Sequence, residues 1–410
     1  MSKIQYGFNM SELLAPAGNL EKLKWAIQYG ADAVYFGIES FSLRNFAGNF
    51  SLDDVDQGMA YLRQHHKKGY VTLNIYPWSH EYKALLSEAR KLEEIGVDAF
   101  IVSDLGVIWE LKKNGFQTPI HISTQANTVS YQTINAYQAL GAKRVNLARE
   151  LSLNQIADIQ SNIQQIPVET EVFIHGAICF SYSGRCAISD YLAGRKANRG
   201  ECTHPCRWNY FLMEEKRPNE FIPVFEDDRG YYLMNTKELA LFPFVKALKE
   251  MGVNSFKIEG RMKSIHYVAS TVAFYRKIID GHNYSENDGM DLLNRISNRG
   301  YSYGFMKGGI TPEDYAIDQR HSTSHSRFVG NVIEETIDDK PLLNVRNTIH
   351  AGETLEMMLP SGQFKNIVLP ELLHLKDNTF VKTANHGSYI RLSENIPAYS
   401  IFRRIDRMSS

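Results

Sequence analysis

Residues 20–37 read LEKLKWAIQYGADAVYFG and contain one helix, one turn and one strand. Apolar residues recur at helical spacing over 20–29, which predicts an amphipathic helix. The apolar, β-type run 33–37 predicts a strand that is buried on both faces. Gly30 lies between them, where a helix can end in a left-handed turn. The stretch therefore predicts a helix that leads directly into a buried strand.

The same pattern recurs through the first 260 residues or so. Glycine turns of similar sequence occupy 95–99, 140–144 and 251–255, and further helices are expected over 52–67, 81–94 and 131–140. Eight short apolar runs read as strands: 13–15, 33–37, 70–76, 99–104, 120–125, 144–149, 172–175 and 256–259. Eight such units in this length predict an α/β fold of the (β/α)₈ TIM-barrel type. An open doubly wound sheet is the alternative.

The pattern changes after Gly260. Helices are expected over 265–280 and 289–296, followed by a connector at 297–326 that is rich in Gly, Tyr, Ser and His. Short strands with turn dipeptides then predict a small all-β barrel over 327–410. We therefore expect a barrel domain at 1–296, with a cysteine-containing loop at 176–210, and a separate C-terminal domain.

Composition limits the classes of protein that the chain can be. Hydrophobic residues make up 43% of the 410 residues and charged residues 22%, which is typical of a globular protein. No apolar run approaches the ~18 residues of a membrane span, and the N-terminus lacks the pattern of a signal peptide. The formal net charge is −1, so nucleic-acid binding would need a local basic patch. We expect a cytoplasmic protein without a membrane partner.

All four cysteines fall in one segment, at positions 179, 186, 202 and 206, with the spacing C-x6-C-x15-C-x3-C. Four thiolates this close together indicate a shared metal site in a reducing compartment. Zinc is one alternative, but structural zinc sites usually have two short knuckles, and only Cys202 and Cys206 approximate one. The wide first pair favours a [4Fe–4S] cluster. The C-x3-C-x2-C spacing of radical S-adenosylmethionine enzymes is absent.

Four motifs around these cysteines and in the barrel point to a known family. Residues 171–189 contain E-x-F-x-x-G-A-I-C-x4-G-x-C-x-I-S, and 12–18, 122–125 and 257–261 read ELLAPAG, ISTQ and KIEGR. These motifs resemble those of peptidase family U32, the collagenase-like peptidases, over nearly the whole chain. The C-terminal domain and the closing FRR at 402–404 are most similar to its prephenate-dependent tRNA uridine-34 hydroxylases.

The resemblance implies a function. Those relatives convert wobble uridine to 5-hydroxyuridine, and the four cysteines would hold an iron–sulfur cluster. The expected partners are the anticodon loop of tRNA, a small dianionic donor such as prephenate as co-substrate, and a homologous partner subunit. Because subfamilies share the motifs, hydroxylation of another RNA or of a quinone precursor remains an alternative, as do proteolysis and a non-catalytic RNA-binding or assembly role.

The chemistry of the chain argues against proteolysis. A cysteine protease needs a thiolate beside a histidine, and a metalloprotease needs a motif such as H-E-x-x-H, which the sequence lacks. Every cysteine is better explained as a cluster ligand. His175 and His204 lie near the cysteines in the sequence and leave a Cys–His pair open.

The cysteine segment also carries a basic patch. The segment contains five cationic residues and only two acidic ones, Asp190 and Glu201. Five aromatic residues are interleaved with the cationic ones. Cations that neutralise phosphates, together with rings that stack on unpaired bases, suit single-stranded RNA. A solvated loop with ordinary packing is the alternative. The candidate RNA-binding residues are Arg185, Arg195, Lys196, Arg199 and Arg207.

Polar residues at the ends of the predicted strands should gather at the carboxyl face of the barrel, where barrel enzymes place their chemistry. Arg149 and Arg261 could bind the two carboxylates of a donor, or pair with Glu150 or Glu259. His175 is a candidate acid or base, although a buried histidine is often structural. The predicted catalytic residues are Arg149, His175, Glu259 and Arg261, with Asn74, Asp104, Gln125 and Glu150 as further pocket residues.

Overall fold

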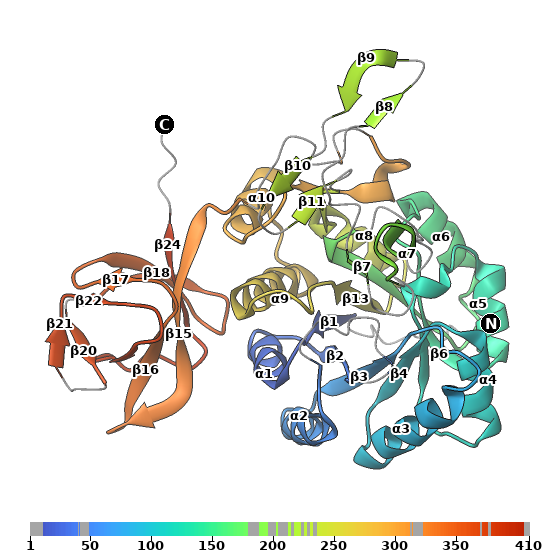
Figure 1. Cartoon of the computed structure of the whole chain (residues 1–410), viewed down its shortest axis with the longest axis horizontal. Coiled ribbons are helices and arrows are strands. Elements are labelled where there is room, and N and C mark those ends of the chain that lie inside the picture. The colour runs from blue at the N-terminus through green and yellow to red at the C-terminus, as the bar shows by residue number, and fades with distance from the viewer. Residues whose placement is uncertain are drawn as a thin grey trace, which may run out of the picture.

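Figure 1 shows the computed structural model of the chain, a barrel joined to a smaller β domain. The structure describes residues 11–39, 41, 49–178, 188–195, 202–203, 212–214, 217–222, 225–227, 230–232, 236–311, 314, 323–369, 371–375 and 379–405.

Eight parallel strands form the barrel. Strand β1 pairs with β2 and with β13, and β13 also pairs with β7, so the sheet closes on itself. Closure excludes the doubly wound alternative and confirms the (β/α)₈ prediction, and each predicted apolar run overlaps one strand. The strands are β1 (Glu12–Pro16), β2 (Ala33–Gly37), β3 (Lys68–Leu73), β4 (Ala99–Val102), β5 (Ile120–Ile122), β6 (Ala142–Asn146), β7 (Glu169–Ala177) and β13 (Ser255–Ile258).

Helices alternate with these strands and surround them (Figure 1). They are α1 (Leu20–Gln28), α2 (Leu52–Gln64), α3 (Tyr82–Ile95), α4 (Leu105–Lys113), α5 (Tyr131–Ala139), α6 (Leu153–Asn162), α8 (Val245–Glu250) and α9 (Ile265–Ile279), with α10 (Glu286–Asn294) after the barrel. In the four predicted glycine turns, the glycine φ angles are 85° to 100°. Helix α2 ends earlier than predicted because the chain turns at His66, whose φ is 54°. None of the described helices is long and apolar enough to cross a membrane.

An insertion follows β7 and contains the cysteine segment. Its described elements are α7 (Ile188–Ala193), β8 (Leu212–Glu214), β9 (Arg217–Ile222), β10 (Phe225–Asp227), β11 (Gly230–Tyr232) and β12 (Glu238–Ala240). Strand β12 pairs antiparallel with β7, and β14 (Tyr301–Ser302), from the predicted connector, pairs with β12. These two strands therefore extend the barrel sheet outward beside β7.

The C-terminal domain is all-β, as predicted. Its eight-stranded antiparallel sheet has the order β19-β18-β24-β15-β16-β23-β20-β21, with a small β17–β22 ladder, around a core of its own. The strands are β15 (Ser326–Ile337), β16 (Lys340–Val345), β17 (Ile349–His350), β18 (Thr354–Met358), β19 (Phe364–Val368), β20 (Leu372–His374), β21 (Thr379–Val381), β22 (Thr383–Ala384), β23 (Tyr389–Arg391) and β24 (Ile401–Ile405).

This domain packs against α1 and α9 of the barrel. The hydroxyl of Tyr29 donates to the Tyr399 carbonyl at 2.7 Å, and the Trp25 ring meets the Tyr399 ring edge-on at 5.0 Å. On α9, His266 stacks on Phe328, with ring centroids 5.2 Å apart. These buried contacts fix which edge of the β domain lies near the carboxyl face of the barrel.

Candidate active site at the barrel mouth

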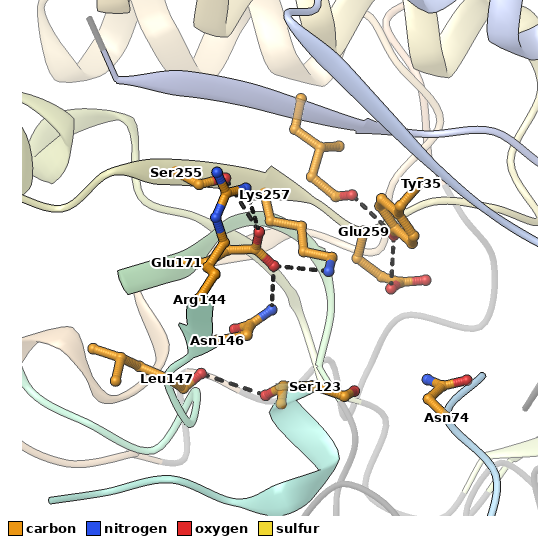
Figure 2. A network of polar contacts seen from close by, with 12 residues as sticks. Tyr35, Asn74, Ser123, Arg144, Asn146, Leu147, Glu171, Ser255, Lys257 and Glu259 are labelled. Atoms are coloured by element: carbon orange, nitrogen blue, oxygen red, sulfur yellow. Dashed lines mark hydrogen bonds and ion pairs between the residues drawn. The ribbon is translucent and has the colours of Figure 1, made fainter. Parts of the chain in front are cut away.

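The interior of the barrel is charged where most barrels are apolar. Glu171 on β7 is 2% exposed, and its carboxylate accepts hydrogen bonds from Lys257 Nζ and Asn146 Nδ2, each at 2.8 Å. Ser255 Oγ donates to the same carboxylate at 3.2 Å. Figure 2 shows these side chains converging from β6, β7 and β13. We call Glu12, Arg144, Asn146, Glu171, Ser255 and Lys257 the interior network.

Arg144 joins the network to the amino-terminal end of the barrel, where β1 and β7 begin. It is 4% exposed and pairs with Glu12, with Glu169 at 2.6 Å and with Glu171 at 3.4 Å. Burial by itself raises the pKa of Glu171, but the charges of Lys257 and Arg144 outweigh burial and hold that pKa below its ordinary value. The network therefore stays ionised and internally paired.

Above the interior network, a second set of polar side chains lies at the carboxyl ends of the strands. The Tyr35 hydroxyl lies 3.2 Å from Glu259 Oε2, and Arg149 NH2 lies 3.8 Å from the same oxygen. The Arg149 guanidinium lies over the Phe173 ring at 3.9 Å. Figure 2 shows the Tyr35–Glu259 pair beside the Lys257 side chain. We call Tyr35, Arg149, Glu259 and Arg261 the mouth site.

Arg261 completes the mouth site from the loop after β13. It is 4% exposed, and its NH1 lies 3.3 Å from Thr72 Oγ1. Two glycines allow this loop to approach its neighbours. A Cβ atom on Gly18 would lie 2.2 Å from the Arg261 carbonyl oxygen, and one on Gly176 would lie 2.4 Å from the Glu259 carbonyl oxygen. Gly176 also has φ 106°. Both glycines belong to the motifs read from the sequence.

The other predicted pocket residues have varied surroundings. Gln125, in the short helix Thr124–Ala126, accepts hydrogen bonds from Asn74 Nδ2 at 2.8 Å and from Ser103 Oγ at 2.9 Å. Asp104 is the N-cap of α4 and also accepts from the Tyr82 hydroxyl at 2.8 Å, which gives its side chain a structural task. Glu150 is half-buried in the loop after β6. Asn74 and Gln125 therefore line the carboxyl face, whereas Asp104 caps a helix.

His175 points away from the mouth site. Its ring lies 5.4 to 5.7 Å from the rings of Tyr267, Tyr275 and Tyr301, which belong to α9 and β14 outside the barrel. Strand alternation predicts that His175 faces inward like residues 171 and 173, but the register of β7 on β13 shifts between Lys257 and Ile258. Burial lowers the pKa of His175 to about 4. Among the described residues, no hydrogen bond, ion pair or ring contact joins the His175 side chain to the mouth site, and its catalytic role stays a prediction.

The described part of the cysteine segment brings two distant pieces of it together. Ser189 Oγ lies 3.1 Å from Thr203 Oγ1 and accepts from the Thr203 backbone N–H at 3.0 Å. Cys202 is half-buried beside this link. The link holds the chain just after Cys186 against the chain at Cys202. Within the part of the chain that the structure describes, no group of three or more metal-ligating side chains is found.

Most of the predicted cluster ligands and RNA-binding residues of the cysteine segment lie outside the described part of the chain. Arg195 is described and exposed, two residues after α7, whereas Arg185, Lys196, Arg199 and Arg207 lie outside the described residues. The same holds for Cys179, Cys186 and Cys206. Their proposed roles remain predictions.

Sequence reasoning assigned no role to Tyr35, Arg144, Lys257 or Thr72. A signal for two of them was present, because Arg144 and Asn146 alternate along β6, and Ser255 and Lys257 alternate along β13. Polar residues at alternate positions of a barrel strand indicate a polar interior. Which of these polar residues meet across the barrel depends on the pairing of strands far apart in the sequence.

Comparison with known proteins agrees with the motifs. Residues 18–314 match the model of peptidase family U32, and residues 324–403 match the model of the peptidase family U32 C-terminal domain. The chain belongs to peptidase family U32. The mouth site and the glycines that shape it fall within the first matched region of this U32 chain.

Relatives of the U32 chain include proteins named for RNA modification. It is 36% identical to tRNA hydroxylation protein P of Escherichia coli, over 89% of each chain. It is 35% identical to tRNA hydroxylation protein P1 of Bacillus subtilis, over 85% of this chain and 83% of that one. A third relative, the 23S rRNA 5-hydroxycytidine C2501 synthase of E. coli, is 36% identical over 66% of this chain and 39% of its own length.

Proposed function

We propose that this protein hydroxylates the wobble uridine of tRNA to 5-hydroxyuridine, using a prephenate-like dianion as donor and a [4Fe–4S] cluster. The observation that carries the proposal is the similarity, over most of both chains, to relatives named as tRNA hydroxylation proteins. The enzyme would work in the cytoplasm, with a homologous subunit as a further proposed partner.

The mouth site has the charge that an anionic donor needs. Arg149 and Arg261 supply two guanidinium groups, and Glu259 supplies one carboxylate at 3.8 Å from Arg149. Guanidinium groups bind carboxylates in a planar, two-point geometry. Lys257, directly below, is already paired with Glu171 at 2.8 Å, so we assign donor binding to the two arginines.

Tyr35 and Phe173 would position these groups. The Tyr35 hydroxyl lies within hydrogen-bond distance of both the Glu259 carboxylate, at 3.2 Å, and the Ile258 carbonyl, at 3.1 Å. The Phe173 ring carries the Arg149 guanidinium on its face. A donor carboxylate that displaced Glu259 from Arg149 would therefore meet a guanidinium whose direction is set in advance.

Cys179, Cys186, Cys202 and Cys206 would hold the iron–sulfur cluster at the same face. Four thiolates match the ligand number of a cubane cluster, and the Ser189–Thr203 link fits a shared ligand set. When bound, the cluster would handle electrons beside the mouth. The flanking cations, of which Arg195 is exposed two residues after α7, would contact the phosphates of the anticodon loop.

Nucleoside analysis of cellular tRNA tests the proposal. A bacterial strain without its own enzymes of this kind should lack 5-hydroxyuridine derivatives, and this chain should restore them, whereas Arg149→Ala should not. Restoration of a different hydroxylated nucleoside would assign another RNA substrate. Failure of the wild-type chain to change any RNA, together with casein or gelatin cleavage that requires Cys179, would favour a peptidase.

A second experiment tests the cluster. Protein purified without oxygen should be brown and contain about four irons and four sulfides per chain. Cys202→Ala should lower the iron content and the stability, because the loop loses a ligand that organises it. Stoichiometric zinc without iron in the wild-type protein would overturn the cluster assignment.

A further inference from the structure

A basic edge lies on the β domain, away from the cysteine segment. Arg327 stands at the start of β15, Arg346 follows β16, and Arg404 lies near the end of β24. Asn347, Thr348 and His350 are exposed between them. We call these six residues the basic edge.

All residues of the basic edge except Arg346 line, together with Glu353, an open hollow of about 450 Å³. Within the hollow, Arg404 pairs with Glu353, its NH2 lying 2.8 Å from Glu353 Oε2, and also donates to the Thr348 carbonyl at 3.1 Å. Arg404 and the His350 backbone N–H hold the pKa of Glu353 below its ordinary value. Glu353 is thus neutralised by a neighbour, whereas Arg327 makes no ion pair with any described residue. The hollow keeps a positive charge.

The two ends of the β domain carry opposite charge. Strand β15 contains Arg327 near its start and ends, twelve residues long, in a hairpin that carries Glu334, Glu335, Asp338 and Asp339, all exposed. Glu334 pairs with Lys24 and Asp338 with Arg391, so the negative charge of this end comes from Glu335 and Asp339. At about 3.3 Å per residue, β15 separates the two ends by roughly 35 to 40 Å. In Figure 1 the β15–β16 hairpin lies at the lower end of the domain and the end of β24 at the upper end. A polyanion would be attracted to one end and repelled by the other.

The basic edge lies on the same side of the molecule as the barrel mouth. Arg346 NH2 is 3.6 Å from Glu21 in the first turn of α1, and the next residue, Lys22, donates to the Arg261 carbonyl at 3.4 Å. Phe328, next to Arg327, stacks on His266 at the start of α9, which follows the loop of Arg261. Two helix starts at the carboxyl face therefore connect the mouth site to the basic edge.

We propose that the basic edge binds the phosphate backbone of the tRNA outside the anticodon loop, while the loop enters the mouth. This inference rests on the proposed function. Arginines with neighbouring amide, hydroxyl and imidazole groups are suited to phosphate oxygens. RNA is favoured over an acidic protein because the proposed substrate is a polyanion much longer than the mouth, and the acidic hairpin fixes the direction in which it can lie.

Charge reversal at Arg327 tests the proposal. Arg327→Glu should weaken binding of full-length tRNA at least tenfold at low salt, and make the salt dependence of affinity shallower by about one unit of slope for each phosphate that the protein no longer binds. The KM for tRNA should rise with kcat nearly unchanged. Binding of an isolated anticodon hairpin should change less. Lys340→Glu, at the acidic hairpin, has the same change in charge and should leave all of these quantities unaltered.

The outcomes separate the two proposals. If wild-type protein modifies tRNA but Arg327→Glu behaves like Lys340→Glu, the basic edge is not an RNA surface and the proposed function stands. If Arg327→Glu leaves tRNA affinity intact but loses a co-purifying acidic protein, the edge serves that partner instead. If the wild-type chain neither binds nor modifies tRNA, the proposed function itself fails. Arg346→Gln, which keeps a hydrogen-bonding side chain beside Asn331, should weaken tRNA binding less than Arg327→Glu does.

Discussion

The interior network and the mouth site are both built from charged side chains inside one barrel, yet they differ in how closely these charges are paired. In the interior, Glu171 contacts Lys257 and Asn146 at 2.8 Å each. At the mouth, Arg149 and Glu259 are 3.8 Å apart. The comparison shows that the described ion pairs in the interior are shorter than the Arg149–Glu259 pair at the mouth.

The burial of the two regions is similar, so burial alone does not separate them. Glu171 is 2% exposed and Arg261 is 4% exposed. The two regions differ in position, since Glu171 lies inside the barrel between two cations, while Arg261 lies in the loop after β13, with its NH1 3.3 Å from Thr72 Oγ1. Substitutions in the two regions should therefore affect different measurements.

The largest expected effect is on stability, from the interior network. Glu171→Gln removes the carboxylate between Lys257 and Arg144 and leaves a buried ammonium without its counter-charge. Breaking a buried pair in this way typically costs ~3–5 kcal/mol of unfolding free energy. Urea unfolding should show this loss. Glu169→Gln also touches Arg144, but Glu169 is 47% exposed, so it should cost less than about 1 kcal/mol.

A double variant sharpens the first prediction. Glu171→Gln combined with Lys257→Met removes both charges and should recover part of the lost stability, because no unpaired charge remains buried. Equal instability of the single and double variants would show that the network matters through its hydrogen bonds and not through its charges.

The next effect concerns pH and the outward-facing His175. Its pKa of about 4 lies below the 6.5 of an exposed histidine, so the unfolded chain binds more protons between these values. Stability should therefore fall as the pH is lowered from about 6.5 to 4, by up to ~3 kcal/mol from this residue. His175→Gln should flatten the pH dependence of the urea midpoint. If the variant kept the pH dependence of the wild-type urea midpoint but lost activity at neutral pH, His175 would instead have a role in the reaction at the mouth site.

Substitution of Arg261 should have a smaller effect. It should reduce the binding free energy of the donor and leave stability unchanged. Arg261→Ala should raise the KM for the donor at least tenfold, because a charge-assisted contact contributes ~1.5–3 kcal/mol. Iron content and tRNA affinity should remain near those of the wild type. Arg261→Lys should recover little, since an ammonium lacks the planar two-point geometry. Full activity at limiting donor, or loss of iron, would make Arg261 structural.

The smallest effect should come from Tyr35→Phe. This change removes one hydroxyl between Glu259 and the Ile258 carbonyl while keeping the ring against Lys257. We expect a loss of ~1 kcal/mol, visible as a several-fold lower kcat/KM for the donor. A loss as large as that of Glu171→Gln would show that the two regions form one coupled unit.

Much of the fold could be predicted from the sequence because its signals are local. The apolar periodicity of 20–29, the turn at Gly30 and the run 33–37 lie within one short stretch, and their repetition predicts the eight-stranded barrel. The clustering of four cysteines is equally local. Glu259, Arg149 and Arg261 could also be placed at the carboxyl face, because each follows a predicted strand.

Only the tertiary structure decided which polar groups meet. Lys257 reaches Glu171 across 86 residues, and Arg144 reaches Glu12 across 132, because barrel closure brings distant strands into register. His175 faces outward because the register shift on β7 reverses the alternation that the sequence predicts. Local sequence carries the period of a strand, whereas the partner and the face of each side chain depend on the register between strands, which forms only when the sheet closes.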